Sequence, residues 1–350
     1  MIVPEFLDIA LVINGERLTG WRTIDIGRSM EKGFFEFNAT ATSPWRTDSR
    51  RKIEAGQPFE VKYGNELLMT GYIDDVYPEY DANTHELSIS GRSKTADLVD
   101  CSTIGKTFTD QTLVQIAEAL CDPFDIKVID KAGENKKFRD QQAIAEGEAI
   151  WDFLDQLARI RAVRLMSDVD GNLVITRAGT TRSKTPLVLG GNIRQASGTF
   201  SYRNRFRDYH VVANQAGETS QLTARDTSLP YGTIRDGVIK RHRPIVIVNE
   251  HSADIEDCQK RADWQMRTHA GRSESVVYTV GGWTDDNGKT WLPNVKVPVD
   301  DAYLGTASDK LIAESWLKLD KSGARTELLV MPVSAFDLVA IPEEKKGFLL

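Results

Sequence analysis

A weak internal repeat is the feature of the sequence that most restricts its fold. In the first copy, PFEVKY at 58–63 is followed by LLMTGYI, a polar turn (DANT) and ELSI at 86–89. In the second copy, PNVKV at 293–297 is followed by KLIAESWL, a polar turn (DKSGA) and ELLV at 327–330. Strand order and spacing agree, which we interpret as a duplication. The alternative is a chance match, since any two antiparallel hairpins share alternating residues and small polar turns.

The first third of the chain has the pattern of a β-domain. Short alternating or β-branched segments, separated by turn residues, run from residue 9 to about 100. Asn14 and Gly15 follow IALVI and predict a tight hairpin, because both positions tolerate a positive φ. Six or seven strands without a convincing helix favour a barrel or a sandwich.

The middle third predicts a small α/β unit. After Thr109, which we expect to cap the helix, apolar residues from Leu113 to Leu120 follow helical spacing. A second helix is expected over 148–162, and Asp170-Gly171 predicts a hairpin between two strands.

Strands return from about residue 186, interrupted by one helix that Ser252 caps and that runs to about Arg272. We therefore expect an α+β, mainly β fold: two similar β-barrel domains with a small α/β domain between them. The predicted domains are a first β-barrel at 1–100, an α/β domain at 101–185 and a second β-barrel at 186–350 with one long helix at about 252–272. Three such chains could close a pseudo-six-fold trimeric ring of six barrels.

Composition and charge exclude several classes of protein. The formal net charge of −7 argues against tight wrapping of nucleic acid, and we expect the basic run at 240–243 to be a solvated loop. No apolar stretch could span a bilayer, and the N-terminus does not have the pattern of a signal peptide. Cys101, Cys121 and Cys258 are too widely spaced to indicate a disulfide framework or a thiolate zinc site.

A search for catalytic motifs finds none. The five histidines lack HExxH or HxH spacing, and GxSxG, GxxxxGK[ST] and GxGxxG are absent. Adjacent acidic residues on a strand point to opposite faces and cannot share one substrate. DVDGN at 168–172 reads as a β-turn rather than a calcium loop. We expect no enzymatic activity, no catalytic or metal-binding residue and no cofactor.

Several stretches together resemble the Mu-like phage tail baseplate hub proteins, which are related to the T-even phage hub and to the N-terminal part of type VI secretion spike proteins. The stretches are VINGERLTGWRTIDIGRSME (12–31), GYIDDV (71–76), SGRSKTADLVDCS (90–102), DGNLVITRAG (170–179), NRFRDYHVVA (204–213), RHRPIVIV (241–248), RADWQMR (261–267) and GWTDDNGKTWLPNVKVPVDD (282–301). They cover nearly the whole length in the order of the family.

The resemblance implies a structural subunit of a contractile tail. A homotrimer would join the six-fold tail tube to a separate three-fold spike protein, and DNA would pass through its channel without specific binding. Other baseplate proteins would be its further partners. We expect no membrane insertion, and a location in the virion after assembly in the host cytoplasm.

Candidate contact residues lie in the two most specific stretches. They are Arg92, Lys94, Thr95, Asp97 and Asp100, with Trp283 and Trp291. They are expected to fix a domain junction or contact another subunit, and a local turn and cap network is the alternative. The scattered tryptophans leave open a carbohydrate- or oligonucleotide-binding barrel protein. A hydrolase whose carboxylates converge only in the fold is a further alternative.

Overall fold

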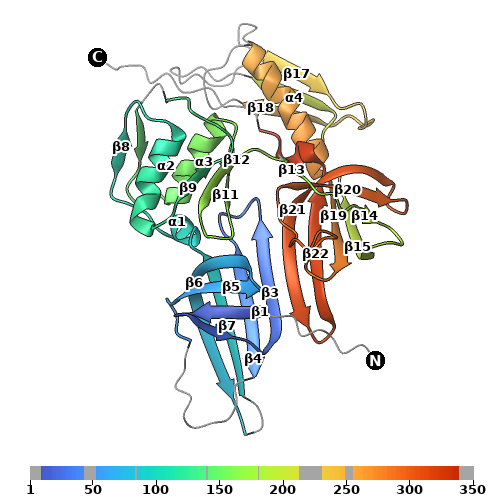
Figure 1. The fold of residues 1–350 in the computed structure, drawn as a ribbon. Helices are drawn as coiled ribbons and strands as arrows, with labels where there is room; N and C mark the ends of the chain where they lie inside the picture. Colours follow the sequence, from blue (N-terminus) through green and yellow to red (C-terminus); the bar gives the residue numbers. More distant parts are fainter. Residues whose placement is uncertain are drawn as a thin grey trace.

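The computed structural model describes residues 9–42, 53–82, 85–138, 141–179, 181–212, 231–248 and 255–338. Strands make up 50% and helices 17% of the structure, so the prediction of a mainly β fold is confirmed. Figure 1 shows the α/β unit beside a large twisted sheet, with a second, smaller unit around α4 at the end of the molecule opposite the β6–β7 hairpin. None of the described helices is both long and apolar enough to cross a membrane.

The first third forms the seven strands that its pattern predicts. They are β1 (Ile9–Ile13), β2 (Glu16–Leu18), β3 (Trp21–Ser29), β4 (Glu36–Thr42), β5 (Pro58–Tyr63), β6 (Glu66–Tyr80) and β7 (His85–Ser93). The hairpin at Asn14-Gly15 is confirmed: Asn14 has φ 51° and Gly15 φ 81°, and Ile13 pairs with Glu16. Positive φ at both turn residues matches the right-handed twist of the two strands.

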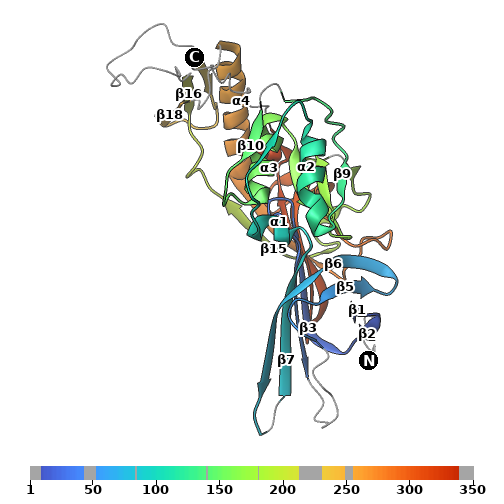
Figure 2. The same ribbon diagram turned by 90° about the vertical axis from the view of Figure 1, so that its left-hand side faces the viewer.

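The α/β unit begins directly after β7. Its elements are α1 (Ala96–Asp100), β8 (Lys106–Phe108), α2 (Leu113–Cys121), η1 (Asp122–Phe124), β9 (Val128–Asp130), β10 (Gln142–Ile144), α3 (Ile150–Ile160), β11 (Arg164–Ser167) and β12 (Leu173–Thr176). The helices α2 and α3 bury their apolar faces in a separate core, which also contains Leu165 and Ile175. Figure 2 shows this unit above the long strands β3 and β7.

The expected cap of α2 at Thr109 is wrong, and the cap is Thr112. The Thr112 hydroxyl accepts a hydrogen bond from the amide of Gln115 at 3.2 Å, and the Gln115 side chain accepts one from the Thr112 amide at 3.0 Å. This reciprocal pair satisfies two amides that the first turn leaves unpaired, which a threonine one turn earlier cannot do. The hairpin at Asp170-Gly171 is confirmed, because Asp168 accepts hydrogen bonds from the following amides.

The last third supplies the remaining strands of the large sheet. They are β13 (Thr181–Arg182), β14 (Leu187–Val188), β15 (Ile193–Phe200), β19 (Glu274–Gly281), β20 (Val295–Asp301), β21 (Thr306–Asp320) and β22 (Gly323–Met331), followed by η2 (Val333–Phe336). The strand order is β15-β19-β22-β21-β3-β4-β7-β6-β5-β1-β2, with β13, β14 and β20 attached beside β21. The recorded pairing forms an open path, and two closed barrels remain a prediction.

A second small unit interrupts the last third between β15 and β19. Its strands β16 (Asp208–Val212), β17 (Tyr231–Arg235) and β18 (Pro244–Val248) form a separate sheet, on which α4 (Ile255–Arg272) packs. The predicted cap Ser252 lies outside the described residues. Because these strands do not join the large sheet, 186–350 is more than one continuous β-domain. We propose to keep the division at 100 and 185, with this unit as an insertion.

Strand pairing supports the duplication. The sequence β4-β7-β6-β5 in the first part matches β19-β22-β21-β20 in the second, with antiparallel neighbours throughout. In the first half, Glu86 of β7 lies opposite Glu79 of β6. The equivalent pair in the second half is Arg325 of β22 opposite Lys318 of β21, so the residue equivalent to Glu86 is Arg325 and not Glu327. The sequence comparison was two residues out of register at this strand, because a shift of two keeps the same face inward and leaves the alternation unchanged.

Candidate functional site

The two halves of the large sheet meet where β3 pairs with β21, and we call this pairing the internal seam. Residues 24–29 of β3 are antiparallel to residues 314–319 of β21. Trp316 lies over Gly27, and a Cβ at Gly27 would approach the indole ring to 2.6 Å. The glycine therefore leaves the space that the Trp316 ring occupies, and a side chain at this position would displace the ring.

Arg28 is buried at the centre of the internal seam, with 0% of its surface exposed. Its guanidinium donates hydrogen bonds to the Leu68 carbonyl at 2.9 Å, the Trp291 carbonyl at 3.2 Å and the Thr290 hydroxyl at 3.3 Å. These acceptors come from β6 and from the segment before β20. One side chain therefore joins both halves of the sheet.

Electrostatics at the internal seam favour a charged Arg28 despite its burial. Burial lowers the pKa of the Arg28 guanidinium to about 10, and the nearby Glu66 carboxylate opposes that shift. The Glu66 carboxylate accepts a hydrogen bond from the Thr290 hydroxyl at 2.8 Å. With a pKa about three units above neutral pH, the guanidinium keeps its proton at neutral pH.

Trp283 and Trp291, predicted as contact residues, both lie at the internal seam. Trp283 is 1% exposed, donates from Nε1 to the Lys318 carbonyl at 2.9 Å and meets Tyr63 edge-on at 5.8 Å between ring centroids. Although it follows β19 in the chain, it packs in the core of the first half. The Trp291 carbonyl also accepts from the Ser315 hydroxyl at 2.8 Å. These residues stabilise a contact within the chain.

Arg92 on β7 organises the junction between the first half of the sheet and the α/β unit. Its guanidinium binds Asp74 through two hydrogen bonds at 2.7 and 3.0 Å, and Asp100 at the end of α1 through two at 2.7 and 3.2 Å. It also lies over the Phe34 ring at 5.2 Å. The hydrogen bonds to Asp74 and then Asp100 raise the pKa of Arg92.

The other predicted junction residues serve the same connection. Thr95 is fully buried, and its hydroxyl shares a hydrogen bond with Ser93, which also contacts Ser167 of β11; both distances are 3.0 Å. Lys94 lies 3.8 Å from Asp125. Burial, and then repulsion from Asp100, raise the pKa of Asp97. The prediction of a domain junction fits these contacts, and a contact with another subunit stays a prediction.

Replacing Arg92 by Ala is expected to destabilise the junction by about 1–2 kcal/mol, because two carboxylates lose charge-assisted hydrogen bonds while half-exposed Asp100 recovers solvation. Urea unfolding followed by far-UV circular dichroism measures the change. Arg182→Ala is the control, since Arg182 also binds a carboxylate through two hydrogen bonds, at 2.7 and 2.9 Å to Asp309, but its side chain is 56% exposed. Equal losses in the two variants would contradict a specific role for Arg92.

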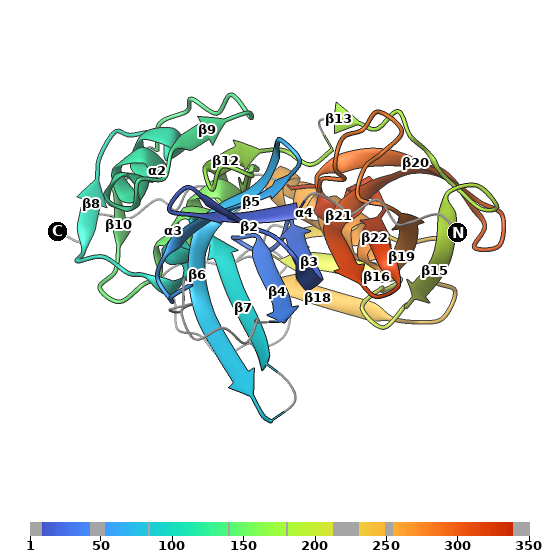
Figure 3. The ribbon, with the colours of Figure 1, turned by 60° about the horizontal axis from the view of Figure 1, so that its bottom comes forward.

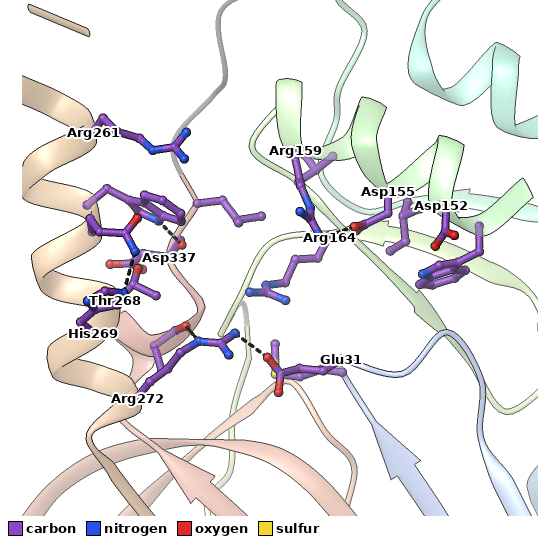
Figure 4. Close-up of a pocket in the computed structure, with 18 residues that line it drawn as sticks. Glu31, Asp152, Asp155, Arg159, Arg164, Arg261, Thr268, His269, Arg272 and Asp337 are labelled. Atoms are coloured by element: carbon purple, nitrogen blue, oxygen red, sulfur yellow. Dashed lines mark hydrogen bonds and ion pairs between the residues drawn. The ribbon is translucent and has the colours of Figure 1, made fainter. Parts of the chain in front are cut away.

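A pocket of about 630 Å³ lies between the α/β unit and α4 (Figure 4). Two ion pairs lie in its lining, Glu31 with Arg272 and Asp155 with Arg159, each with an N–O distance of 2.6 Å. Arg164 points into it from β11, and burial lowers the pKa of this guanidinium. Its lining comes from the α/β unit, from α4 and from the segments after β3 and β22, so the pocket lies at a junction between units. The polar lining also includes Asp152, Thr268, His269 and Asp337.

Sequence reasoning did not identify Arg28 as important. The available signal was a charge at an apolar position: in IDIGRSM, Arg28 shares the alternate positions of Ile24, Ile26 and Met30, next to a glycine, whereas Asp25 falls on the other face. Among the described residues, no group of three or more His, Cys, Asp or Glu side chains lies close enough together to hold a metal ion. The candidate functional features of the described structure are therefore its strand pairings and the junctions between its units.

Comparison with known families matches three segments of the chain. Residues 8–93 match the family described as Mu phage baseplate assembly protein GpP-like, N-terminal. Residues 95–177 match baseplate hub protein gp44-like, second domain, and residues 255–339 match Mu phage baseplate assembly protein GpP, fourth domain.

Whole-chain comparisons agree with these matches. Baseplate hub protein gp44 of Escherichia phage Mu is 30% identical, over 97% of this chain and 91% of that protein. The 43 kDa tail protein of prophage MuSo2 from Shewanella oneidensis is 36% identical with a TM-score of 0.85, over 95% of this chain and 99% of that one. The tail protein from Neisseria meningitidis MC58 is 23% identical with a TM-score of 0.79, over 94% and 98%.

Proposed function

Because the chain belongs to the Mu-like phage baseplate hub proteins, we propose that it is a homotrimeric hub subunit of a contractile tail. Its role in the baseplate is structural, as the names of its relatives support. The observation that carries the trimeric form is the duplicated half-sheet. Two equivalent halves in each chain would let three chains surround an axis with six similar surfaces.

Such a ring would adapt two symmetries. Its six similar halves would face the six-fold tail tube, and its three chains would match a separate three-fold spike protein. The channel at the axis would let DNA pass, and a net charge of −7 favours a conduit that does not retain DNA. The protein would act within the virion after assembly in the host cytoplasm, with other baseplate proteins around it.

The tryptophans do not favour the alternative of a glycan- or oligonucleotide-binding protein. Trp283 and Trp291 are buried, and the other four tryptophans in the described part of the chain are half-buried. Stacking on a sugar or a base requires an accessible ring face. A hydrolase of this kind would need two carboxylates held across a cleft, and in the Figure 4 pocket Glu31 and Asp155 are held in ion pairs by Arg272 and Arg159.

Light scattering of the purified protein over a dilution series tests the proposal. We expect a species of three times the chain mass of 39.1 kDa, in moderate and in high salt, because the shared surfaces would be hydrogen-bonded strands rather than exposed ion pairs. A dissociating trimer at low concentration would also agree. A monomer at every concentration, together with measurable glycan or single-strand binding, would contradict the hub function.

A further inference from the structure

Two of the open edges of the large sheet, β15 and the far part of β6, have no strand partner on one side within the described part of the chain. β15 pairs only with β19, and each residue from Arg194 to Phe200 is exposed. On the other side, β5 accompanies β6 only as far as Tyr72, and Ile73 still exchanges backbone hydrogen bonds with Gly56 and Gln57, so among the described strands residues 75–80 pair with β7 alone. Figure 3 shows β15 and this part of β6 on opposite sides of the sheet. Open edges of this kind readily accept another strand.

The internal seam shows which strand such an edge accepts. By the order of pairing, β21 in the second half is equivalent to β6 in the first, and β3 in the first half is equivalent to β15 in the second. The outer edge of β21 is occupied by β3. The equivalent outer edge of β6 is open, and β15, the strand equivalent to β3, is also open. Each chain therefore carries both parts of a second seam, on opposite sides.

Irregularities in the pairing fix the equivalence of β6 and β21 residue by residue. The register of β6 against β7 shifts between Ile73 and Asp75, and that of β21 against β22 shifts between Ile312 and Glu314. Aligning the two shifts makes Asp75 equivalent to Glu314. Residues 75–80 are then equivalent to 314–319, the segment that β3 covers in the internal seam.

A second pair of irregularities fixes β3 against β15. The register of β3 against β4 shifts between Trp21 and Thr23, and that of β15 against β19 shifts between Ile193 and Gln195. Thr23 is therefore equivalent to Gln195, and residues 24–29 are equivalent to 196–201. A shared β-bulge at both places is stronger evidence than shared alternation, because bulges occur at few positions in a sheet.

We propose that residues 75–80 of β6 in one copy pair antiparallel with residues 196–201 of the next copy, in the register of the internal seam. Glu314 faces Ser29 and Lys318 faces Asp25 in that seam. Transferred to the open edges, the register places Asp75 opposite Ser201, Glu79 opposite Ser197 and Tyr80 opposite Ala196. The partner is a second copy of this chain, so the pairing deepens, and rests on, the proposed hub function.

Exposed aromatic residues lie at both open edges. Tyr77 is 59% and Tyr80 76% exposed on β6, while Phe200 at the end of β15 is 55% and the following Tyr202 49% exposed. Single exposed apolar side chains are common on protein surfaces, but a group of them at a strand edge indicates an interaction surface. In the proposed register Tyr77 faces Thr199 and Phe200 faces Val76. Cross-strand pairs of an aromatic with a β-branched residue stabilise antiparallel sheets by roughly 0.2–1 kcal/mol each.

Charge also differs between the two edges. Asp75 and Glu79 make the open edge of β6 acidic, whereas Asp74 is bound by Arg92 within the chain. Arg194 and Arg203 flank the open part of β15, whereas Arg205 pairs with Asp236. An acidic strand beside a segment with basic ends favours this pairing over β6 with β6 or β15 with β15.

The position of the buried arginine supports an apolar second seam. Arg28 and Ser315 face each other in the internal seam. Their equivalents at the open edges are Phe200 and Val76, which would face each other between copies. An apolar pair avoids the desolvation of a charge, so the second seam can form without a network like that around Arg28. Pro78 on β6 has no amide hydrogen, which leaves the ladder one donor short.

Disulfide trapping tests the register in the full-length chain. The variant E79C/S197C, in a Cys101→Ser background, should form a cross-link between copies on mild oxidation, because facing residues fall within the Cα separation that a disulfide requires. The matched positive control is D25C/K318C, the equivalent pair inside one chain. The negative control is D75C/S197C, which keeps the same face but is four residues out of register. We expect roughly tenfold more cross-linked product from E79C/S197C than from D75C/S197C.

The outcomes separate the pairing from the hub function. Covalent trimers on a non-reducing gel, with D25C/K318C closed within the chain, would support both. Longer covalent chains would support the pairing but overturn the trimeric ring. A trimer by light scattering without the E79C/S197C cross-link would overturn the pairing and leave the hub in place. A monomer without any cross-link, while the internal control closes, would overturn both.

Discussion

Replacing Arg28 by Ala is expected to cost about 3–5 kcal/mol of unfolding free energy, the largest effect among the single charged residues described. Three acceptors would lose their donor, the Leu68 and Trp291 carbonyls and the Thr290 hydroxyl, and Glu66 would lose its nearby positive charge. The space left is enclosed, so water does not readily replace the guanidinium.

Tryptophan fluorescence during urea unfolding measures this change, and one of the seven tryptophans, Trp291, contacts Arg28 directly. The matched control is Arg22→Ala on the same strand, where the ion pair with Glu86 is exposed and the expected change is below about 0.5 kcal/mol. If Arg28→Ala cost no more than Arg22→Ala, the buried network would not be what joins the two halves.

Replacing Trp283 by Ala is expected to cost about 3–5 kcal/mol, since it removes a large side chain that is 1% exposed. The cavity would open between the two halves of the sheet, because Trp283 belongs to the second half in sequence and packs in the core of the first. Hydrogen exchange of the β3 and β21 amides should therefore increase more than that of β12 in the α/β unit.

Trp283→Phe separates packing from hydrogen bonding. It keeps most of the ring volume and removes the donor to the Lys318 carbonyl, so a smaller loss of about 1–2 kcal/mol is expected. Ile104→Ala is the control for truncation of a large apolar side chain without burial, because Ile104 is 84% exposed. Uniform exchange over the whole sheet in Trp283→Ala would argue against a local opening of the internal seam.

The elements that could be predicted from the sequence are those with a local cause. The hairpin at Asn14-Gly15 depends on two residues that accept positive φ, and α2 depends on apolar spacing over two turns. The duplication was also visible, since strand order survives in the alternation. Alternation does not determine the register, because a shift of two residues leaves the pattern unchanged. The register is fixed by the bulges in β6 and β21, which the alternation does not reveal.

Long-range features could not be predicted. The strands β16 and β18 have the same β-branched composition as strands of the large sheet, so their separate sheet depends on pairing that no local signal records. The network of Arg28 joins residues separated by up to 263 positions in the chain. Arg92 and Thr95 could be linked because they lie together in one mixed stretch. Trp291 was also predicted as a contact residue, but no local pattern linked it to Arg28.

The proline on β6 has a consequence for the newly made chain. The internal seam forms within one molecule, but a strand partner from another copy is met only at a rate that depends on concentration. Until then two edges are open to indiscriminate pairing and aggregation. Pro78, with Asp75 and Glu79, places on the β6 edge the residue types that natural edge strands use against aggregation. The β6 edge can therefore stay unpaired in solution until a matching strand binds, without aggregating with other strands.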